Sequence, residues 1–463
     1  MKKIVLSALI ISVSSTYAVA KDDFMNKIIK FYSIATNGVI NFEAKKVKGG
    51  YELKLSPKTY TYKKIFNPNY SIKVEVDEGP VVTKPHFTFA KAGLVSKINL
   101  LKLLNQQTQN EINKNLKKAP ILNYEAIVSF RDILKENFNL EPVVIEEDDA
   151  KFYLSEVKAK SNVDLTNFTG AIDIDINKVK VEPKKEKGLF LLEGVTLHNE
   201  ISDKPVDNIA LFGKSSVDVK KFALKVDGQK PLNLNFTFNV ASEIQKVDDK
   251  FLNFALKTHT KTNDVDTIAF SKGIKESKSD LMLKNLGTQG VIEFIKFSQK
   301  MQEIQEKLLQ DSNDPLKKEA AIAAYMAELT TLNNTLVDIF NKTFVSNRSR
   351  IILDVELISD KKSFIKLNLL YKAKPLSGDM NSALISLAAQ GLSIFDGDFE
   401  IQLDKDLATT INPLSLMVLE LLKNKGFATE QNGIYHLKGT LKDGKLIING
   451  KAYTLQELTT TLF

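Results

Sequence analysis

Residues 232–238 read LNLNFTF, a strict alternation of apolar and polar side chains. Alternation with a period of two is typical of a β-strand that buries one face. The same pattern recurs in residues 39–42, 51–55, 72–76, 87–89, 171–176, 251–256, 351–357, 364–371, 399–403 and 434–448. It therefore predicts a mainly β protein of the α+β class, built from long antiparallel sheets.

Glycine and proline mark two of the expected breaks between strands. Gly49-Gly50 lies between two alternating runs and predicts a hairpin turn, because glycine adopts positive φ angles at no steric cost. Gly79-Pro80 predicts a turn or an edge break after the strand around Val76.

The middle of the chain changes from strand to helix periodicity. Residues 289–309 predict one helix, and Asn313-Asp314-Pro315 predicts the start of a second, with Asp314 as its cap and Pro315 in its first turn. Together they predict a helical hairpin whose apolar stripes pack on each other or on a sheet, the alternative being an exposed helix that binds a partner or a membrane. The stripes are Ile292, Ile295, Met301, Ile304 and Leu308 in the first helix, and Ile322, Met326, Leu329, Leu336, Ile339 and Phe340 in the second.

This hairpin divides the expected architecture into two β-rich halves. We predict a signal peptide at 1–20, an N-terminal β-rich region at 21–285, the helical hairpin at 286–345 and a C-terminal β-rich region at 346–463. Shorter helices are expected at 22–34, 95–116, 383–394 and 414–423.

The N-terminus carries the pattern of an export signal. Lys2 and Lys3 precede an apolar run from Ile4 to Val13, and Ala18-Val19-Ala20 is a small-residue cleavage site. A bilayer-spanning helix needs about 20 mostly apolar residues, and serines and a threonine interrupt this shorter run. We therefore expect an exported, periplasmic or envelope-associated protein that is cleaved after Ala20, with a retained anchor as the alternative.

Composition limits the classes of partner and of stabilising chemistry. The chain has 463 residues, a formal net charge of +8 and no cysteine, so disulfides and cysteine-linked lipids are excluded. Removal of Lys2 and Lys3 with the signal leaves +6, because 8 − 2 = 6. Its lysines are spread along the chain, and the densest group, residues 184–187, is expected to be a solvated loop; nucleic acid is not an expected partner.

The four histidines do not form a recognisable metal or catalytic motif. They are His86, His198, His259 and His436, each in or beside a strand-like segment and without a second histidine at metal-ligand spacing. His198-Asn199-Glu200 lacks the second histidine of a zinc-protease helix. A structural or surface role is expected for each histidine.

The acidic and serine motifs are also incomplete. Asp173, Asp175 and Asn177 begin with calcium-loop spacing, but Lys178 replaces the turn glycine and Lys184 replaces the bidentate glutamate, so a strand is expected. Residues 146–149 (EEDD) are expected to form a solvated turn, and no Gly-x-Ser-x-Gly sequence marks a serine nucleophile. The sequence therefore predicts no catalytic, cofactor-binding or metal-binding residue and no cofactor, and enzymatic activity is unsupported.

Several short segments resemble the YdgA-like family of exported bacterial proteins of unknown function. Residues 433–437 (GIYHL) and 442–451 (KDGKLIINGK) are similar to its C-terminal end, and Asn449-Gly450-Lys451 is the most recognisable fragment. Residues 77–80 (DEGP) are similar to its N-terminal strand, with Glu78 where the family has histidine, and 192–224 is similar to two adjacent strands in it. The resemblance implies an envelope protein with a long β-rich body and no established chemistry.

Three functional hypotheses remain from the residues alone. The first is a non-enzymatic envelope protein that holds an apolar ligand, such as a lipid acyl chain, between a sheet and the central helices. The evidence for it is that several strands are apolar on two faces, for example those that contain Phe236 and Phe238 or Phe364, Leu367 and Leu369. The second is a scaffold that contacts envelope proteins through sheet edges, with Lys54, Lys220 and Lys366 as edge guards. The remote third is a hydrolase of envelope polymers, which needs paired carboxylates in a cleft.

Overall fold

A computed structural model describes residues 23–36, 40–57, 65–83, 88–184, 188–227, 232–311 and 318–462. The predicted signal peptide, His86 and the Asn313-Asp314-Pro315 start of the second central helix lie outside these residues. Within them, none of the helices has both the length and the apolar character that crossing a membrane requires. The predicted class, α+β and mainly β with long antiparallel sheet, is confirmed.

The chain divides into two compact units, Met1–Leu232 and Asn233–Phe463. The sequence pattern instead predicts two β-rich halves on either side of residues 286–345. Compactness and independent folding are different properties, so the predicted domain boundaries stay a prediction.

The strands of the first unit form an antiparallel sheet in the order β1-β2-β3-β4-β5-β6-β9-β10-β11-β12, with the β7–β8 hairpin joined to β10. Their bounds are β1 Ile40–Val47, β2 Gly50–Pro57, β3 Ser71–Thr83, β4 Thr88–Asn99, β5 Ile121–Val128, β6 Ile133–Leu140, β7 Val143–Glu146, β8 Ala150–Leu154, β9 Val157–Asp164, β10 Thr169–Pro183, β11 Gly188–Ile201 and β12 Gly213–Val226. Helix α2 (Asp23–Ala35), the short η1 (Leu100–Leu103) and α4 (Gln106–Asn113) complete the unit.

Helix α2 supplies the centre of the first unit's core. Its Met25, Ile28, Phe31 and Tyr32 are buried against strand residues such as Leu94. Their spacing of three and four residues places them on one helix face. A short helix is expected at 22–34 with Phe24, Ile28, Ile29 and Tyr32 on one side, and the helix is present, although Met25 and Phe31 are buried in it and Ile29 is only partly buried.

Two predictions for the first unit are wrong. Residues 95–116 are not one helix, because the strand β4 continues to Asn99 and only η1 and α4 follow. The side chain of Asn99 caps η1 and that of Asn105 caps α4, so the helical pattern is split into short pieces. Strand β3 does not break at Gly79-Pro80 but continues to Thr83 across a register shift between Glu78 and Val81, a bulge that accommodates the proline without a ladder hydrogen bond.

The strands of the second unit form an antiparallel sheet in the order β13-β14-β15-β16-β17-β18-β20-β21-β22, with β19 paired to β20. Their bounds are β13 Leu232–Lys246, β14 Phe251–Thr262, β15 Glu276–Gly287, β16 Arg350–Ile358, β17 Lys362–Tyr371, β18 Phe395–Asp404, β19 Thr429–Gln431, β20 Ile434–Lys442, β21 Lys445–Ile448 and β22 Lys451–Tyr453. The turn at Asn449-Gly450 has φ angles of 50° and 78°, as its sequence predicts.

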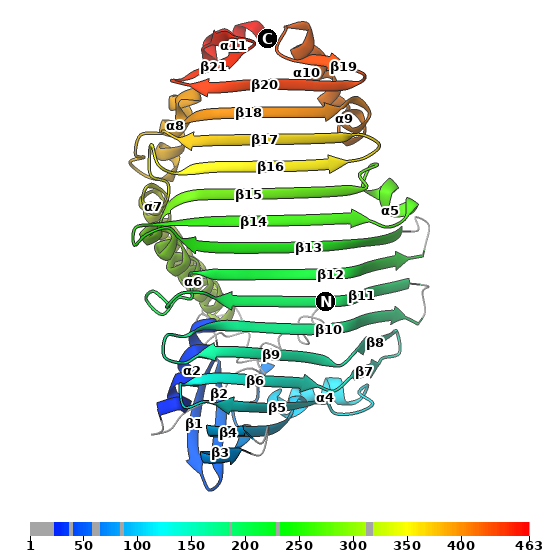
Figure 1. The fold of residues 1–463 in the computed structure, drawn as a ribbon, viewed down its shortest axis with the longest axis vertical. Coiled ribbons are helices and arrows are strands. Elements are labelled where there is room, and N and C mark those ends of the chain that lie inside the picture. The colour runs from blue at the N-terminus through cyan, green and yellow to red at the C-terminus, as the bar shows by residue number, and fades with distance from the viewer. Residues whose placement is uncertain are drawn as a thin grey trace. The chain divides into compact units, whose positions relative to one another are not determined.

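The helices of the second unit lie at opposite ends of these strands (Figure 1). Helices α6 (Thr288–Asp311) and α7 (Lys318–Thr343) connect β15 to β16, and α8 (Met380–Gln390) with η2 (Gly391–Ile394) connects β17 to β18 at the same end. Helices α5 (Val265–Phe270), α9 (Lys405–Ile411) and α10 (Pro413–Asn424) lie at the other end, and α11 (Leu455–Leu462) closes the chain. The predicted central helical hairpin and the helices near 383–394 and 414–423 are present.

The register of the second sheet separates apolar from charged side chains. One row across β14 to β18, which we call the apolar face, consists of Leu256, Leu281, Leu353, Leu367 and Phe399. The neighbouring row on the opposite side, the charged face, consists of Lys257, Asp280, Asp354, Lys366 and Glu400. Cross-strand neighbours in this row carry opposite charges, except for Asp280 and Asp354, which are both acidic. Lys257 forms an ion pair with Asp280, and Lys366 forms one with Asp354.

Two lysines expected to guard sheet edges do not do so. Lys54 lies opposite Glu43 on β1 and Ser71 on β3. Lys366 lies opposite Asp354 on β16 and Glu400 on β18. Because both strands are paired on both sides, these lysines contribute cross-strand charge pairs, and the edge-guard interpretation of them is wrong.

Candidate functional site

An apolar cavity of about 580 Å³ lies in the second unit, where three strands meet three helices. Strands β13, β14 and β15 contribute one wall, and α6, α7, α8 and the segment before α8 contribute the other. The lining consists of Ile244, Leu252, Phe254, Leu283, Leu286, Val291, Phe294, Ile295, Leu336, Val337, Ile339, Phe340, Thr343, Phe344, Leu376, Met380, Ala383, Leu384 and Leu387. Its volume falls in the range of small-molecule binding sites.

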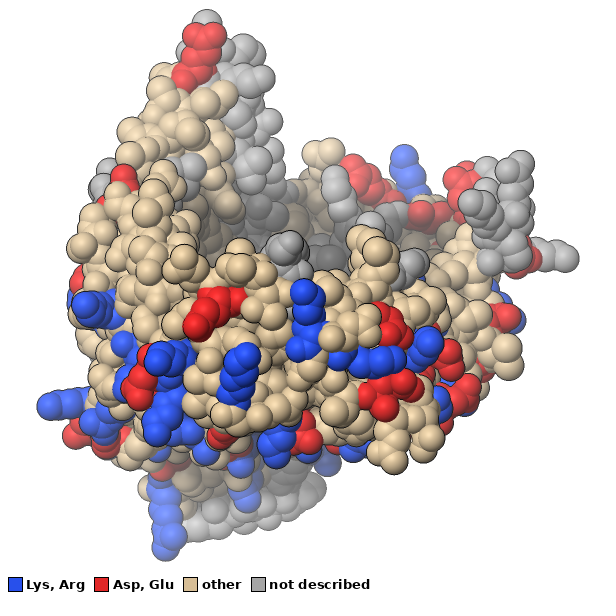
Figure 2. All heavy atoms as spheres, turned by 90° about the horizontal axis from the view of Figure 1, so that it is seen from above, with Lys and Arg blue, Asp and Glu red and all other residues tan. Residues whose placement is uncertain are grey.

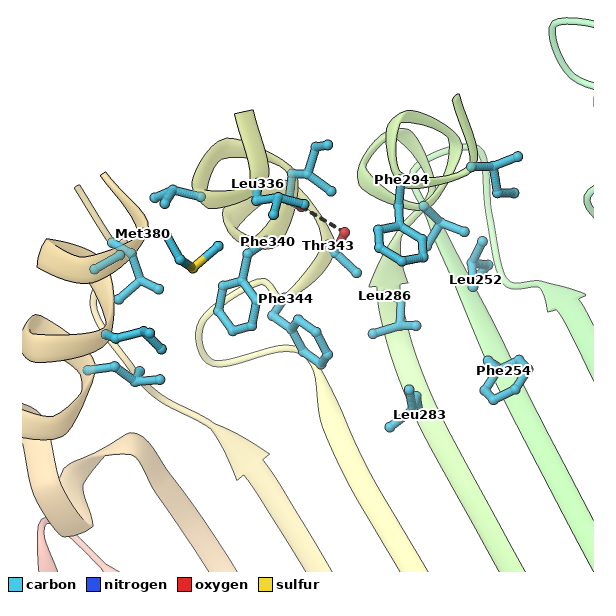
Figure 3. Close-up of a pocket in the computed structure, with 18 of the residues that line it drawn as sticks. Leu252, Phe254, Leu283, Leu286, Phe294, Leu336, Phe340, Thr343, Phe344 and Met380 are labelled. Atoms are coloured by element: carbon cyan, nitrogen blue, oxygen red, sulfur yellow. Dashed lines mark hydrogen bonds between the residues drawn. The ribbon is translucent and has the colours of Figure 1, made fainter. Parts of the chain in front are cut away.

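Aromatic side chains from the end of α7 extend from the helices toward the strands (Figure 3). The rings of Phe340 and Phe344 lie 4.9 Å apart, and both contact Tyr371 at the end of β17, at 6.1 Å and 5.9 Å between centroids. Phe294 approaches from α6, while Leu283 and Phe254 rise from β15 and β14 (Figure 3). Offset and edge-on aromatic contacts of this kind fix ring orientation, so this wall has a defined shape.

Two glycines allow α6 to start directly against the end of α7. A Cβ on Gly290 would lie 2.4 Å from the backbone nitrogen of Thr343, and one on Gly287 would lie 1.9 Å from the carbonyl oxygen of Lys342. Only glycine permits so close an approach of two backbones. The positions of Phe340, Phe344 and Thr343 in the cavity wall therefore depend on these glycines.

Polar contacts outside the cavity hold its helices together. The Lys342 ammonium lies 2.9 Å from a carboxylate oxygen of Glu293 and so links α7 to α6. The hydrogen bond from Gln289 and then that from Lys342 lower the pKa of Glu293. The Asn341 amide donates to the Leu376 carbonyl at 2.8 Å and accepts from the Leu376 N–H at 2.9 Å, which joins α7 to the segment before α8.

The cavity wall offers almost no polar recognition. Among the described lining residues, Thr343 is the one with a polar side chain, and its hydroxyl donates to the Ile339 carbonyl at 2.7 Å. A polar ligand group placed inside would lose its hydrogen bonds to water without replacement, which costs several kcal/mol, about 2–7. The chemistry of the lining therefore suits hydrocarbon.

Part of this wall is predicted by the helical stripes of the sequence. Ile295, Leu336, Ile339 and Phe340 of the predicted stripes line the cavity. Ile292 and Ile304 are buried, at 2% and 7% exposure. Ile322 and Met326 depart from the predicted packing, because 43% and 56% of their surfaces are exposed. The side chain of Leu329 lies outside the described residues.

Most of the remaining wall was not recognised from the sequence. Phe344 continues the stripe by one helical step after Phe340, so period alone could have included it. Phe236 and Phe238, by contrast, lie on the cavity side of β13 but farther along the strand, and Phe364 lies on the charged face beside Glu356. Met380 and Leu384 belong to α8, which begins three residues before the helix predicted near 383–394, and no local pattern indicates that this helix lies against α7.

The polar residues considered for chemistry are distributed over the strands. His198 on β11 lies opposite Asp173 on β10, 2.7 Å from its carboxylate, so the calcium-like spacing is part of a strand as predicted. His259 on β14 lies 2.9 Å from Glu276, and His436 is on β20. In the described part of the chain no three or more histidines, aspartates and glutamates are grouped to hold a metal ion. Basic and acidic side chains are interspersed over the face shown in Figure 2.

The first unit contains a buried carboxylate with a raised pKa. Glu136 on β6 is 2% exposed, and the hydroxyls of Tyr32, Tyr124 and Ser161 donate to it, Tyr124 at 3.0 Å. Burial raises its pKa to about 7, although hydrogen bonds from Ser161, Tyr32 and Tyr124 oppose the rise. These hydrogen bonds link α2 to β5, β6 and β9.

Comparison with known proteins defines the family. A family model described as a bacterial protein of unknown function (DUF945) matches residues 66–456. The chain belongs to DUF945. The match covers most of both units, from the segment before β3 to the start of α11, and the YdgA-like resemblance is compatible with it. No curated protein and no solved structure matches this DUF945 chain.

Proposed function

We propose that this DUF945 protein is a non-enzymatic, exported envelope protein that binds a lipid acyl chain in the apolar cavity of its second unit. The observation that carries the proposal is the cavity itself, with a wall of aliphatic and aromatic side chains between the sheet and the helices. Each buried methylene group contributes about 0.8 kcal/mol, so a chain of several carbons is bound without any polar contact inside.

The first test is to isolate the mature chain, residues 21–463, from the periplasm and to record native mass spectra before and after denaturation. The proposal predicts a near-stoichiometric lipid or fatty acid that is released on unfolding. A protein that carries no ligand and does not take up added oleate would contradict the acyl-chain proposal.

A pair of substitutions on β15 locates the binding. Leu283→Trp places a larger ring into the cavity, so we expect the affinity for a fluorescent fatty acid to fall at least tenfold. Met282→Trp is the matched control, because Met282 is the neighbouring residue of β15, lies on the opposite side of the strand and does not line the cavity. Equal loss in both variants would show that binding does not use the cavity.

Export is proposed from the N-terminal pattern alone. Intact-mass analysis of the periplasmic protein is expected to give a chain that begins at Lys21. A full-length chain in the membrane fraction would instead indicate a retained anchor.

A further inference from the structure

We infer that the ligand is a diacyl lipid, with one acyl chain in the cavity and the second on the apolar face of β14 to β17. This inference rests on the proposed function and extends it from a cavity to a two-part site. Its starting point is that cavity and apolar face are continuous: Leu283 lines the cavity, and Leu281, two residues along β15, is on the apolar face.

The apolar face is incompletely covered. Leu256, Leu281, Leu353 and Leu367 are each only half-buried, although they lie on interior strands. Ile365, two residues from Leu367 on the same side of β17, is 38% exposed. Contiguous apolar surface of this kind marks a binding site more often than scattered single residues do.

The sheet pattern shows that the uncovered side carries no charged residue in the rows of Leu281 and Ile365. In the row through Ile365, its two cross-strand neighbours are Val355 and Ile401, and the row continues with the uncharged Ser279 on β15 and Thr258 on β14. One residue away, Lys366 pairs across the strands with Asp354 and Glu400 on the charged face. An ordinary solvated face would carry such charges, so the side that bears Ile365 is built to contact hydrocarbon.

The same pattern favours a lipid chain over a protein partner. Strands β14 to β17 are hydrogen-bonded on both sides, so a peptide cannot add to them as a further strand. Protein interfaces carry about one hydrogen bond per 100–200 Å², whereas the leucine row offers no side-chain donor or acceptor. An acyl chain needs none.

The cavity and the apolar face around Ile365 are far enough apart for their occupancies to be measured separately. Ile365 lies two rows, or four residues, along the strands from the row of Leu283, a displacement of about 14 Å at 3.4 Å per residue. A single chain confined to the cavity therefore does not reach Ile365, whereas a second chain lying along the face does.

The test uses the absence of cysteine from the chain. Ile365→Cys and its matched control Lys366→Cys each give one reactive thiol, on the apolar and the charged face respectively, for labelling with a polarity-sensitive fluorophore. With dioleoyl phosphatidylcholine vesicles we expect a blue shift from the label at position 365 and none at position 366. Oleate alone is expected to fill the cavity and to shift neither label.

Two results would overturn the inference. In the first, mass spectrometry of the re-isolated protein shows bound phosphatidylcholine, but the fluorescence of the label at position 365 does not shift. In the second, oleate alone gives a shift at position 365 equal to that given by the vesicles. In either case, the single-chain proposal would still stand if Leu283→Trp abolished the binding. If no lipid were bound at all, both the single-chain and the diacyl proposals would be refuted. Val355→Cys with Asp354→Cys gives a second reporter pair on β16 if labelling at position 365 disturbs folding.

Discussion

Glu136 is a buried residue whose ionisation affects stability. Its folded-state pKa of about 7 exceeds the ordinary value of 4.5, so between these pH values the folded chain binds more protons than the unfolded chain. Stability contributed by the protonated carboxyl is then present below pH 4.5 and is lost as pH rises through 7. A shift of this size corresponds to about 3 kcal/mol.

We therefore expect Glu136→Gln to flatten the fall in unfolding free energy of the first unit between pH 5 and pH 8, measured by urea denaturation. The control is Glu146→Gln at the exposed β7–β8 hairpin. Hydrogen bonds from Lys117 and then Lys151 lower the pKa of Glu146, which places its titration below this pH window. An unchanged slope in Glu136→Gln would show that the buried carboxylate is not the titrating group.

At the scale of elements, the contact between α6 and α7 determines the cavity wall. Gly290→Ala would place a methyl group against the backbone of Thr343. Overpacking costs about 1–3 kcal/mol, and the better helix propensity of alanine offsets up to about 1 kcal/mol. We expect a lower unfolding temperature for the second unit and a severalfold loss of fatty-acid affinity.

Gln302→Ala, at an exposed position of the same helix, is the control for Gly290→Ala. It is expected to leave both quantities unchanged. Normal fatty-acid binding by Gly290→Ala would mean that the end of α7 moves without altering the cavity, contrary to the role assigned to this close approach.

At the scale of the whole molecule, the described hydrophobic clusters each lie within one unit. Leu94→Ala removes fully buried methyl groups from the first unit, at a cost of about 2–5 kcal/mol. We expect calorimetry to show a destabilised first unit, while the fatty-acid affinity of the folded protein at 20 °C stays at the wild-type value. A parallel loss of affinity would show that the units are energetically coupled.

Strand identity was readable from the sequence because side-chain direction in a strand depends only on the period of two. The alternation at residues 171–176 and 351–357 predicted β10 and β16 without knowledge of their partners. The prediction of one helix at 95–116 is wrong because two asparagine caps and a 3₁₀ turn interrupt a pattern that resembles one helix.

The sequence by itself determined the mainly β class, the central helical hairpin and the lack of a recognisable catalytic motif, because each follows from local periodicity or residue type. Only the tertiary structure decided that Phe254, Leu283, Phe344 and Met380 surround one cavity. It also decided that Glu136 is buried among three hydroxyls. These sites join residues far apart in the chain, and their contacts depend on strand register and helix packing, which no local pattern specifies.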